Sequence, residues 1–384
     1  MSNNTLVSIM RACRHAIHSH PETAFEEHRT AALIAGKLRD AGIEVHEGIG
    51  KTGLVAVIRN GDGPSLGLRA DMDALPVTEA NEFSHRSQVA GKMHACGHDG
   101  HSSMLLGAAL HLNANRNWRG TINLIFQPAE ESFGGGKVML EDGLFERFPC
   151  DAVFGMHNWP GLPAGTFAIN HGPMMAALDT FEIAVLGKGA HAAMPESGID
   201  PLLIASQIVV ALNTIISRKV SPNESAVLTV TQIHGGDAWN VIPDRAVIRG
   251  TVRCFSEKLQ NYIEEQIRKV AQSIACMSGG QAEVGYTNGY PPTINHHHET
   301  DVAIKAAQEL VGEEKVLFDC VPSMASEDFA FMLKAKQGAY IWLGVDGESP
   351  SAKLHNPLYD FNDDVLETGM MYWVTLAEQF CSIS

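Results

Sequence analysis

Metal-binding residue types crowd into the nine residues MHACGHDGH at positions 93–101. Cys96 and His98 stand two positions apart, so a turn can aim both side chains at one point. Thiolate and imidazole are ligands of zinc and its neighbours in the first transition row. A structural zinc site would use four closed ligands, often in CxxC pairs, and the chain contains no CxxC. On these residues alone a catalytic metal site and a histidine-rich loop or core histidine are equally open, and the choice depends on where the other polar residues fall.

More acids and another histidine follow segments that have the pattern of strands. Three apolar segments, at 65–70, 121–126 and 152–157, are followed or ended by Asp71 and Asp73, by Glu130 and Glu131, and by His157. Ligands of open α/β sheets bind outside the carboxyl ends of the strands, so we expect these side chains to converge. Adjacent Glu130 and Glu131 suggest a division of labour, in which one carboxylate binds metal and the other is a general base.

The elements that must position these residues alternate between strand and helix. This alternation predicts a mostly parallel sheet with helices on both faces. The patterns predict helices over 7–42, 101–116, 302–311 and 364–380, and strands over 53–58, 65–70, 121–126, 152–157 and 339–345.

A second pattern interrupts the first near residue 178. Its order is strand, helix, strand, strand, helix, strand, which is a ferredoxin-like unit, with segments at 179–187, 201–219, 225–233, 245–255, 259–274 and 282–287. We therefore expect a catalytic domain over 1–178 and 293–384, and an inserted domain over 179–292. The histidines at 296–298 fall in the exit segment, and we interpret them as a hinge or surface feature.

Composition excludes several classes of protein. The 384 residues carry a formal net charge of −16, which argues against a nucleic-acid binder. The seven cysteines are odd in number and widely spaced, so we expect no disulfide framework. We find no signal peptide and no apolar run long enough to span a bilayer, so a cytoplasmic location is expected.

The chain resembles the N-acyl-amino-acid amidohydrolases, which include hippurate hydrolases and indole-acetyl-amino-acid hydrolases. They belong to a wider clan of two-metal aminoacylases and carboxypeptidases. The resemblance runs in order over essentially the whole chain, through RADMDALP (69–76), MHACGHDGHSSMLLGAA (93–109), FQPAEE (126–131), GMHNWPG (155–161), GKGAHAAMPESGIDP (187–201), NVIP (240–243), GTVR (250–253), SEDF (326–329) and LHNPLYDFND (354–363).

The resemblance implies a phosphorylase/hydrolase-like α/β catalytic domain with a mixed sheet, plus an inserted ferredoxin-like lid and dimerisation domain. It implies two divalent metal ions, Mn²⁺ or Zn²⁺ before Ni²⁺ or Co²⁺. Glu130 would be the general acid and base. The implied metal ligands are Cys96, His98, Glu131, His157 and His355, and the acids implied to orient them are Asp71, Asp73 and Glu327.

The resemblance also implies roles in the lid. His191 would reach across a dimer to polarise the amide carbonyl, with Asn240 in support, and Arg253 would bind the substrate carboxylate. The implied reaction is cleavage of an N-acyl amino acid into a carboxylic acid and a free amino acid. The alternatives are a dipeptidase or carboxypeptidase of the same clan and a non-catalytic binding protein. The implied partners are a small-molecule substrate and a second copy in a homodimer or dimer of dimers, with neither nucleic acid nor membrane.

Overall fold

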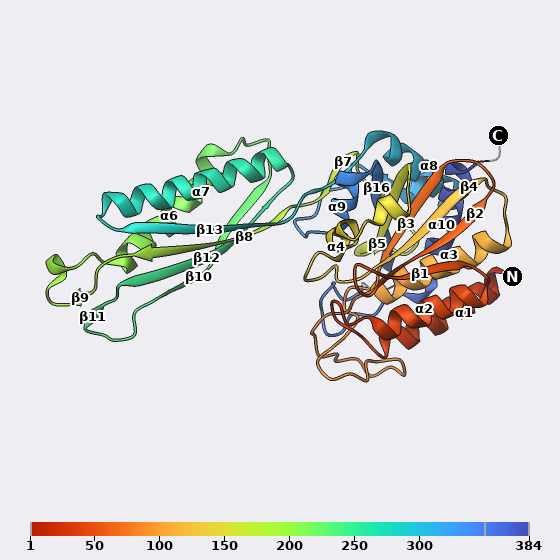
Figure 1. Cartoon of the computed structure of the whole chain (residues 1–384), viewed down its shortest axis with the longest axis horizontal. Helices are drawn as coiled ribbons and strands as arrows, with labels where there is room; N and C mark the ends of the chain where they lie inside the picture. Colours follow the sequence, from red (N-terminus) through yellow and green to blue (C-terminus); the bar gives the residue numbers. More distant parts are fainter. Residues whose placement is uncertain (1, 349–350, 383–384) are drawn as a thin grey trace. The chain divides into compact units, whose positions relative to one another are not determined.

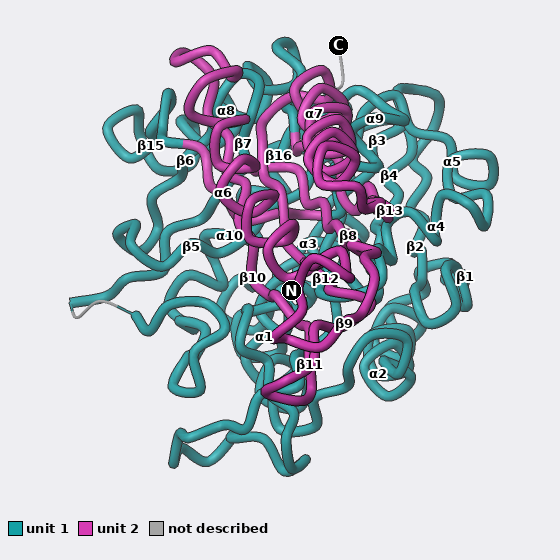
Figure 2. Tube along the Cα trace, turned by 90° about the vertical axis from the view of Figure 1, so that its left-hand side faces the viewer, with its two compact units in different colours: residues 1–174, 294–321, 328–384 teal, residues 175–293, 322–327 magenta. Residues whose placement is uncertain are grey.

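The computed structural model describes residues 2–348 and 351–382, which divide into two compact units (Figures 1 and 2). Unit 1 comprises residues 1–174, 294–321 and 328–384, and unit 2 comprises residues 175–293 and 322–327. The expected domains had their boundaries at 178/179 and 292/293. They also assigned residues 322–327 to the larger domain, whereas the structure groups that segment with unit 2.

Unit 1 is built on a mixed sheet in the strand order β1-β2-β4-β3-β5-β16-β6-β15. Its central neighbours β4, β3, β5 and β16 are parallel, while β1 and β2 add antiparallel pairs at one side. The elements are α1 (Asn3–His18), α2 (His28–Asp40), β1 (Glu44–Ile49), β2 (Gly53–Asn60), β3 (Ser65–Asp71), α3 (His98–Ala114), β4 (Gly120–Gln127), α4 (Gly135–Glu141), α5 (Leu144–Arg147), β5 (Ala152–Pro163), β6 (Phe167–Ile169), β7 (Gly172–Met175), β14 (Thr293–Asn295), α8 (His297–Val311), β15 (Val316–Phe318), α9 (Phe329–Ala335), β16 (Gly338–Asp346) and α10 (Leu366–Phe380).

The alternation of side chains along the strands decides which residues enter the main core. Leu66, Leu68 and Ala70 of β3 pack with residues of α1, α3, α8 and α10 in one buried cluster. The intervening residues of β3, Gly67 and Arg69, lie outside that cluster and face the side that α4 and α9 cover. Because helices cover both faces, the strands are apolar on both sides and the predicted α/β class is confirmed.

Three details of unit 1 differ from the expectations. The helical pattern over 7–42 forms two helices, α1 and α2, because residues 19–27 turn between them. The helix expected at 101–116 begins at His98, inside the histidine-rich segment. The helix expected at 302–311 begins at His297, with His296 as its N-cap, so the histidines at 296–298 belong to α8 of unit 1 instead of a linker. His297 and His298 are exposed, as expected for a surface feature.

Unit 2 contains the six elements in the predicted order. Its antiparallel sheet has the order β10-β12-β8-β13, and α6 and α7 pack against it (Figure 1). A small pair of strands, β9 and β11, was not predicted. The elements are β8 (Leu178–Leu186), β9 (Ala190–His191), α6 (Pro201–Lys219), β10 (Ala226–Gly235), β11 (Val241–Ile242), β12 (Arg245–Cys254), α7 (Glu257–Met277) and β13 (Gln281–Tyr290).

One helix contradicts the expectation that no apolar run has the length to span a bilayer. By length and composition alone α6 qualifies, with a mean hydropathy of 1.4 and 33% of its window buried. A single such helix is weak support for a membrane span, because core helices pass the same test. One apolar face of α6 is buried in the core of unit 2, where it contributes Ile204, Ile208, Leu212 and Ile215. Core packing therefore explains why this face is apolar.

Candidate metal centre

Neighbouring parallel strands bring candidate residues to one edge of the unit 1 sheet. β4, β3 and β5 lie side by side and run in the same direction. Asp71 ends β3, Glu130 and Glu131 follow β4, and His98 begins α3. His157 differs from its expected place, because β5 continues past it to Pro163 and His157 lies inside the strand.

The turn into α3 requires a glycine. Gly97 has a φ of 92°, and a Cβ at this position would lie 2.2 Å from Oδ1 of Asn158. A side chain would therefore clash as well as strain the backbone. Gly97 lets the chain turn sharply between Cys96 and His98, which places both ligand candidates in the same buried cluster.

All five predicted metal ligands lie in one connected cluster. Ligand atoms of Cys96, Glu131 and His355 lie within 4.8 Å of one another. Sγ of Cys96 is 3.4 Å from Nε2 of His157, and Oε1 of Glu131 is 3.2 Å from Nε2 of His355 and 3.9 Å from Nε2 of His98. The cluster joins residues from four separate segments of the chain.

The loop that carries His355 is held against the histidine-rich segment. The backbone N–H of His355 donates to the carbonyl of Ala95 at 2.8 Å. His355 has a φ of 65°, and Ala129, directly before the two glutamates, has a φ of 54°. Left-handed backbone at non-glycine residues persists where the surrounding structure enforces it and is frequent at functional sites. Two of the segments that enter the cluster therefore carry this strain.

Buried acids orient the cluster. Asp73 contacts two members, because its Oδ1 lies 3.2 Å from Nδ1 of His98 and its Oδ2 accepts the backbone N–H of Glu131 at 3.0 Å. Oδ2 of Asp71 is 3.7 Å from Nε2 of His98. Metal-binding imidazoles are usually held in this way by a carboxylate on the second ring nitrogen.

His101 belongs to the site although the sequence reasoning omitted it. Its ligand atom groups with those of Asp71, His98 and His157 within 4.8 Å. Nδ1 of His101 lies 2.6 Å from Oδ1 of Asp71, and its Nε2 accepts the backbone N–H of Asn158 at 3.0 Å. The spacing of His98 and His101 could have identified His101 from the sequence. Residues three apart on a helix share a face, so His101 lies beside His98.

The donor set fits a divalent cation. Nε2 of His98 is buried and has no hydrogen-bond partner among the residues that the structure describes. Burial and the carboxylates of Glu131 and Glu130 raise the pKa of the Cys96 thiol well above its usual range. Burial and neighbouring His101 lower the pKa of His157, which keeps this imidazole neutral and able to coordinate. Buried thiol, imidazole and carboxylate groups gathered in one cluster are the donors that a cation site requires.

Glu130 is placed next to this cluster and is buried. Its ligand atom lies within 4.8 Å of those of His98 and Glu131, and its Oε1 accepts the backbone N–H of Asp328 at 3.4 Å. A buried carboxylate beside a cation site can take a proton from water. Glu327, the residue before Asp328, is also buried, and it belongs to the segment that is grouped with unit 2.

The remaining candidates lie in unit 2. His191 is exposed on β9, where its Nδ1 accepts the backbone N–H of Ala193 at 3.0 Å. The carbonyl of Asn240 accepts the backbone N–H of Ala192 at 3.0 Å, so Asn240 lies beside His191 next to the small strand pair β9 and β11. Arg253 lies on β12 and is half-buried, and burial lowers its pKa.

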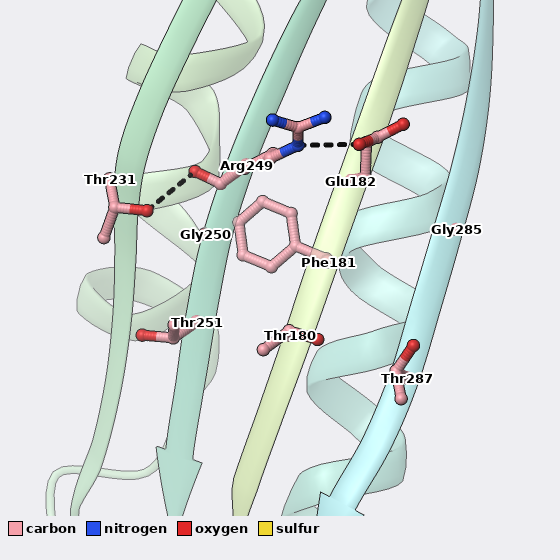
Figure 3. A pocket seen from close by; sticks show the side chains of 9 residues that line it. All are labelled: Thr180, Phe181, Glu182, Thr231, Arg249, Gly250, Thr251, Gly285 and Thr287. Carbon is pink, nitrogen blue, oxygen red and sulfur yellow. Dashed lines mark hydrogen bonds and ion pairs between the residues drawn. The ribbon is translucent and has the colours of Figure 1, made fainter. Parts of the chain in front are cut away.

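A hollow of about 370 Å³ lies over the sheet of unit 2 (Figure 3). Nε of Arg249 donates to Glu182 at 2.7 Å beside it, and Thr251 lies further along the same strand. None of the predicted site residues lines this hollow. Arg253 shares a face of β12 with Arg249 and Thr251, because alternate residues of a strand point the same way.

Known proteins match this chain over nearly its whole length. The sequence pattern of peptidase family M20/M25/M40 matches residues 67–379. The hippurate hydrolase of Campylobacter jejuni is 43% identical over 368 residues, which cover 96% of this chain and 95% of that protein. An N-acetyl-L-cysteine deacetylase of Bacillus subtilis is 40% identical over 365 residues, which cover 94% of this chain and 86% of that protein.

A solved structure is similar in both sequence and fold. The YXEP protein of Bacillus subtilis, described as a dinuclear metal binding peptidase from the M20 family, superposes with a TM-score of 0.87. The match covers 98% of this chain and 99% of that one at 35% identity.

Proposed function

The chain belongs to peptidase family M20/M25/M40, and from this premise we propose that it is a metal-dependent amidohydrolase of N-acyl amino acids. It cleaves the amide bond to release a carboxylic acid and a free amino acid. The names of the hippurate hydrolase and the N-acetyl-L-cysteine deacetylase support this substrate class, since both proteins match this chain along almost its whole length.

One observation carries the proposal. The buried carboxylate of Glu130 lies directly beside a cluster of imidazole, thiolate and carboxylate donors. A binding protein would need the cluster without the adjacent base. Metal-assisted hydrolysis needs both, because one group must activate water next to the polarised carbonyl.

The cluster would hold two divalent ions, as the description of the YXEP protein supports. Zinc and manganese suit the mixed donor set, with nickel and cobalt as alternatives. Bound there, the ions would polarise the amide carbonyl and lower the pKa of a water molecule toward neutrality. The residues that would hold them are Cys96, His98, Glu131, His157 and His355.

The protein's own groups handle the proton. Glu130 takes a proton from the attacking water and delivers it to the leaving nitrogen, which is the usual double role of such a base. Asp73 and Asp71 hold His98 and His101 in place. Glu327 is proposed to support the same site from the segment next to Asp328.

Residues of unit 2 complete the proposed site as a lid. Arg253 would bind the substrate carboxylate, because a guanidinium can donate two parallel hydrogen bonds to it. His191 of the partner subunit would polarise the amide carbonyl, with Asn240 supporting the strand pair that carries it. Hinges near residues 176–180 and 288–296 would let the lid close over the larger, catalytic domain.

The proposed homodimer uses α6 and the edge strand β10. Val210 on α6 is 71% exposed, and Val227 on β10 is 39% exposed. An unpaired edge strand beside an apolar helix face is a natural surface for association. We expect light scattering to give a dimer for the native chain and a monomer for Val210→Glu. Met277→Glu, which changes an apolar residue of 77% exposure on α7, is the matched control and should remain dimeric.

The function is tested by release of free amino acid from a panel of N-acyl amino acids and dipeptides, with and without a chelator. Chelator-sensitive cleavage of N-acyl amino acids supports the proposal. Preference for dipeptides would favour the peptidase alternative. Absence of any turnover in protein that holds two metal ions per chain would reject the amidohydrolase assignment.

A further inference from the structure

A small hollow of unit 1 is lined by residues that neighbour two candidate metal ligands in the chain. Its volume is about 280 Å³, and it is lined by Trp159, Pro160, Lys353 and Leu354. Trp159 follows His157 by two residues on β5, and Leu354 directly precedes His355. Both walls of the hollow therefore extend the two segments that carry candidate ligands.

Trp159 is held in a defined position near the centre. Alternate residues of a strand share a face, so Trp159 points to the same side of β5 as His157, and their ring centroids are 6.3 Å apart. The indole of Trp159 stacks on that of Trp342 with centroids 4.0 Å apart and planes 9° from parallel. Trp342 is 3% exposed and lies opposite His157 in the register of β16 and β5. The buried ring of Trp342 therefore fixes the half-buried ring of Trp159.

The walls suit a flat apolar group. An indole, a proline ring and a leucine side chain form most of the lining. Aromatic rings favour offset-stacked or edge-to-face contact with another ring. Lys353 is exposed, and its Nζ donates to the carbonyl of Pro160 at 3.3 Å, which holds the ammonium group at one wall. Pockets for drug-sized molecules span about 300 to 1,000 Å³, so this hollow accommodates about one ring-sized substituent.

We propose that this hollow is the acyl subsite and that Trp159 makes the enzyme prefer aromatic acyl groups. This inference rests on the proposed amidohydrolase function. The substituent of the acyl group is bonded directly to the carbonyl carbon that is attacked, so its binding pocket must lie beside the metal ligands. Trp159, which lines the hollow, meets that requirement within unit 1 alone, because its ring centroid lies 6.3 Å from that of His157.

The test compares kcat/KM for N-benzoylglycine, N-acetylglycine and N-succinylglycine. The native enzyme should prefer the benzoyl compound. Trp159→Ala should lower the benzoyl-to-acetyl ratio of kcat/KM by about tenfold, and Trp159→Phe should restore most of it. The ratio is independent of the amount of folded enzyme, so partial unfolding of a variant does not affect it. Phe318→Ala, which removes an aromatic ring of 56% exposure from the edge strand β15, should leave the ratio unchanged.

The outcomes separate this inference from the function on which it rests. Turnover of all substrates with an unchanged ratio in Trp159→Ala would assign Trp159 a purely structural role and overturn the subsite. Preference of the native enzyme for the succinyl compound would show that Lys353, and not the indole, selects the acyl group, which would also overturn it. Absence of turnover with every substrate would reject the amidohydrolase function itself.

Discussion

Arg69 and Asp328 form a fully buried ion pair, with Nη2 and Oδ1 3.1 Å apart. Arg69 also donates from Nη1 to Asp71 at 2.8 Å, and the backbone N–H of Asp328 donates to Glu130 at 3.4 Å. One guanidinium thus connects the carboxylate beside His98 with the residue that holds the proposed base. The pair stiffens the face of the sheet from which both sides of the site are built.

Replacing Arg69 with Met should lower the free energy of unfolding by about 3–5 kcal/mol, because it leaves buried carboxylates without their counter-charge. Urea unfolding followed by circular dichroism measures this loss. Arg59→Met is the matched control, since Arg59 pairs with Glu44 at the surface, where the side chains are 59% and 46% exposed. Arg59→Met should lower the free energy of unfolding by less than about 1 kcal/mol. Equal, small losses in both variants would contradict the role of the buried pair.

Glu130→Gln should keep both metal ions but lose activity by about 10²–10⁴-fold, because the amide cannot take the proton from water. Metal content by mass spectrometry and kcat on the best substrate measure the two effects separately. Glu141→Gln, at a side chain of 63% exposure on α4, should be fully active. Near-native turnover by Glu130→Gln would remove this residue from the mechanism.

Removal of metal should lower the thermal unfolding midpoint, because the cluster then holds buried acids without a cation. Metal at 100 to 1,000 times its dissociation constant should add about 3–4 kcal/mol of stability. Calorimetry with and without a chelator gives the shift. Cys96→Ala should abolish most of it, whereas Cys150→Ala, at another buried cysteine, should retain it. A chelator-insensitive midpoint in the native protein would argue against metal binding at this cluster.

Stability should fall as the pH rises from about 6.5 to 9 through the titration of His18. Burial lowers the pKa of His18, but the carboxylates of Asp99 and Glu79, 2.9 and 3.1 Å from its ring nitrogens, outweigh burial and raise it to about 9. Below the unfolded pKa the proton is bound in both states and the stabilisation is complete. Above 6.5 the unfolded chain releases the proton first, so the stabilisation declines and is lost beyond pH 9.

Urea unfolding at several pH values tests this titration. The stabilisation lost by the native protein between these pH values is on the order of 3 kcal/mol. His18→Gln should remove this pH dependence, whereas His28→Gln, at an exposed position, should follow the native curve. Parallel curves for the native protein and His18→Gln would show that the buried pairings of His18 do not stabilise the fold.

Hydrophobic periodicity in the sequence was enough to predict the main elements and the edge of the sheet where the site lies. The apolar alternation of β3 indicates a buried strand, and Asp71 stands where that pattern stops. The positions of Glu130 and His98 follow from the same reasoning. The six elements of unit 2 are long enough for their periods to be read, and they occur in the predicted order. The three-residue strands β6 and β15 are too short to have a readable period.

The sequence therefore determined which residues are buried, which strands end in polar groups and, through its resemblance to a family, which side chains are the proposed metal ligands. Only the tertiary structure decided how buried polar groups pair. Arg69 and Asp328 are 259 positions apart, and no local pattern links them. Likewise, no local pattern predicts that His355 contacts Ala95 or that His101 lies between Asp71 and Asn158. Periodicity records burial one residue at a time, whereas the partner of a buried charge depends on which distant segments the folded chain brings within hydrogen-bonding distance.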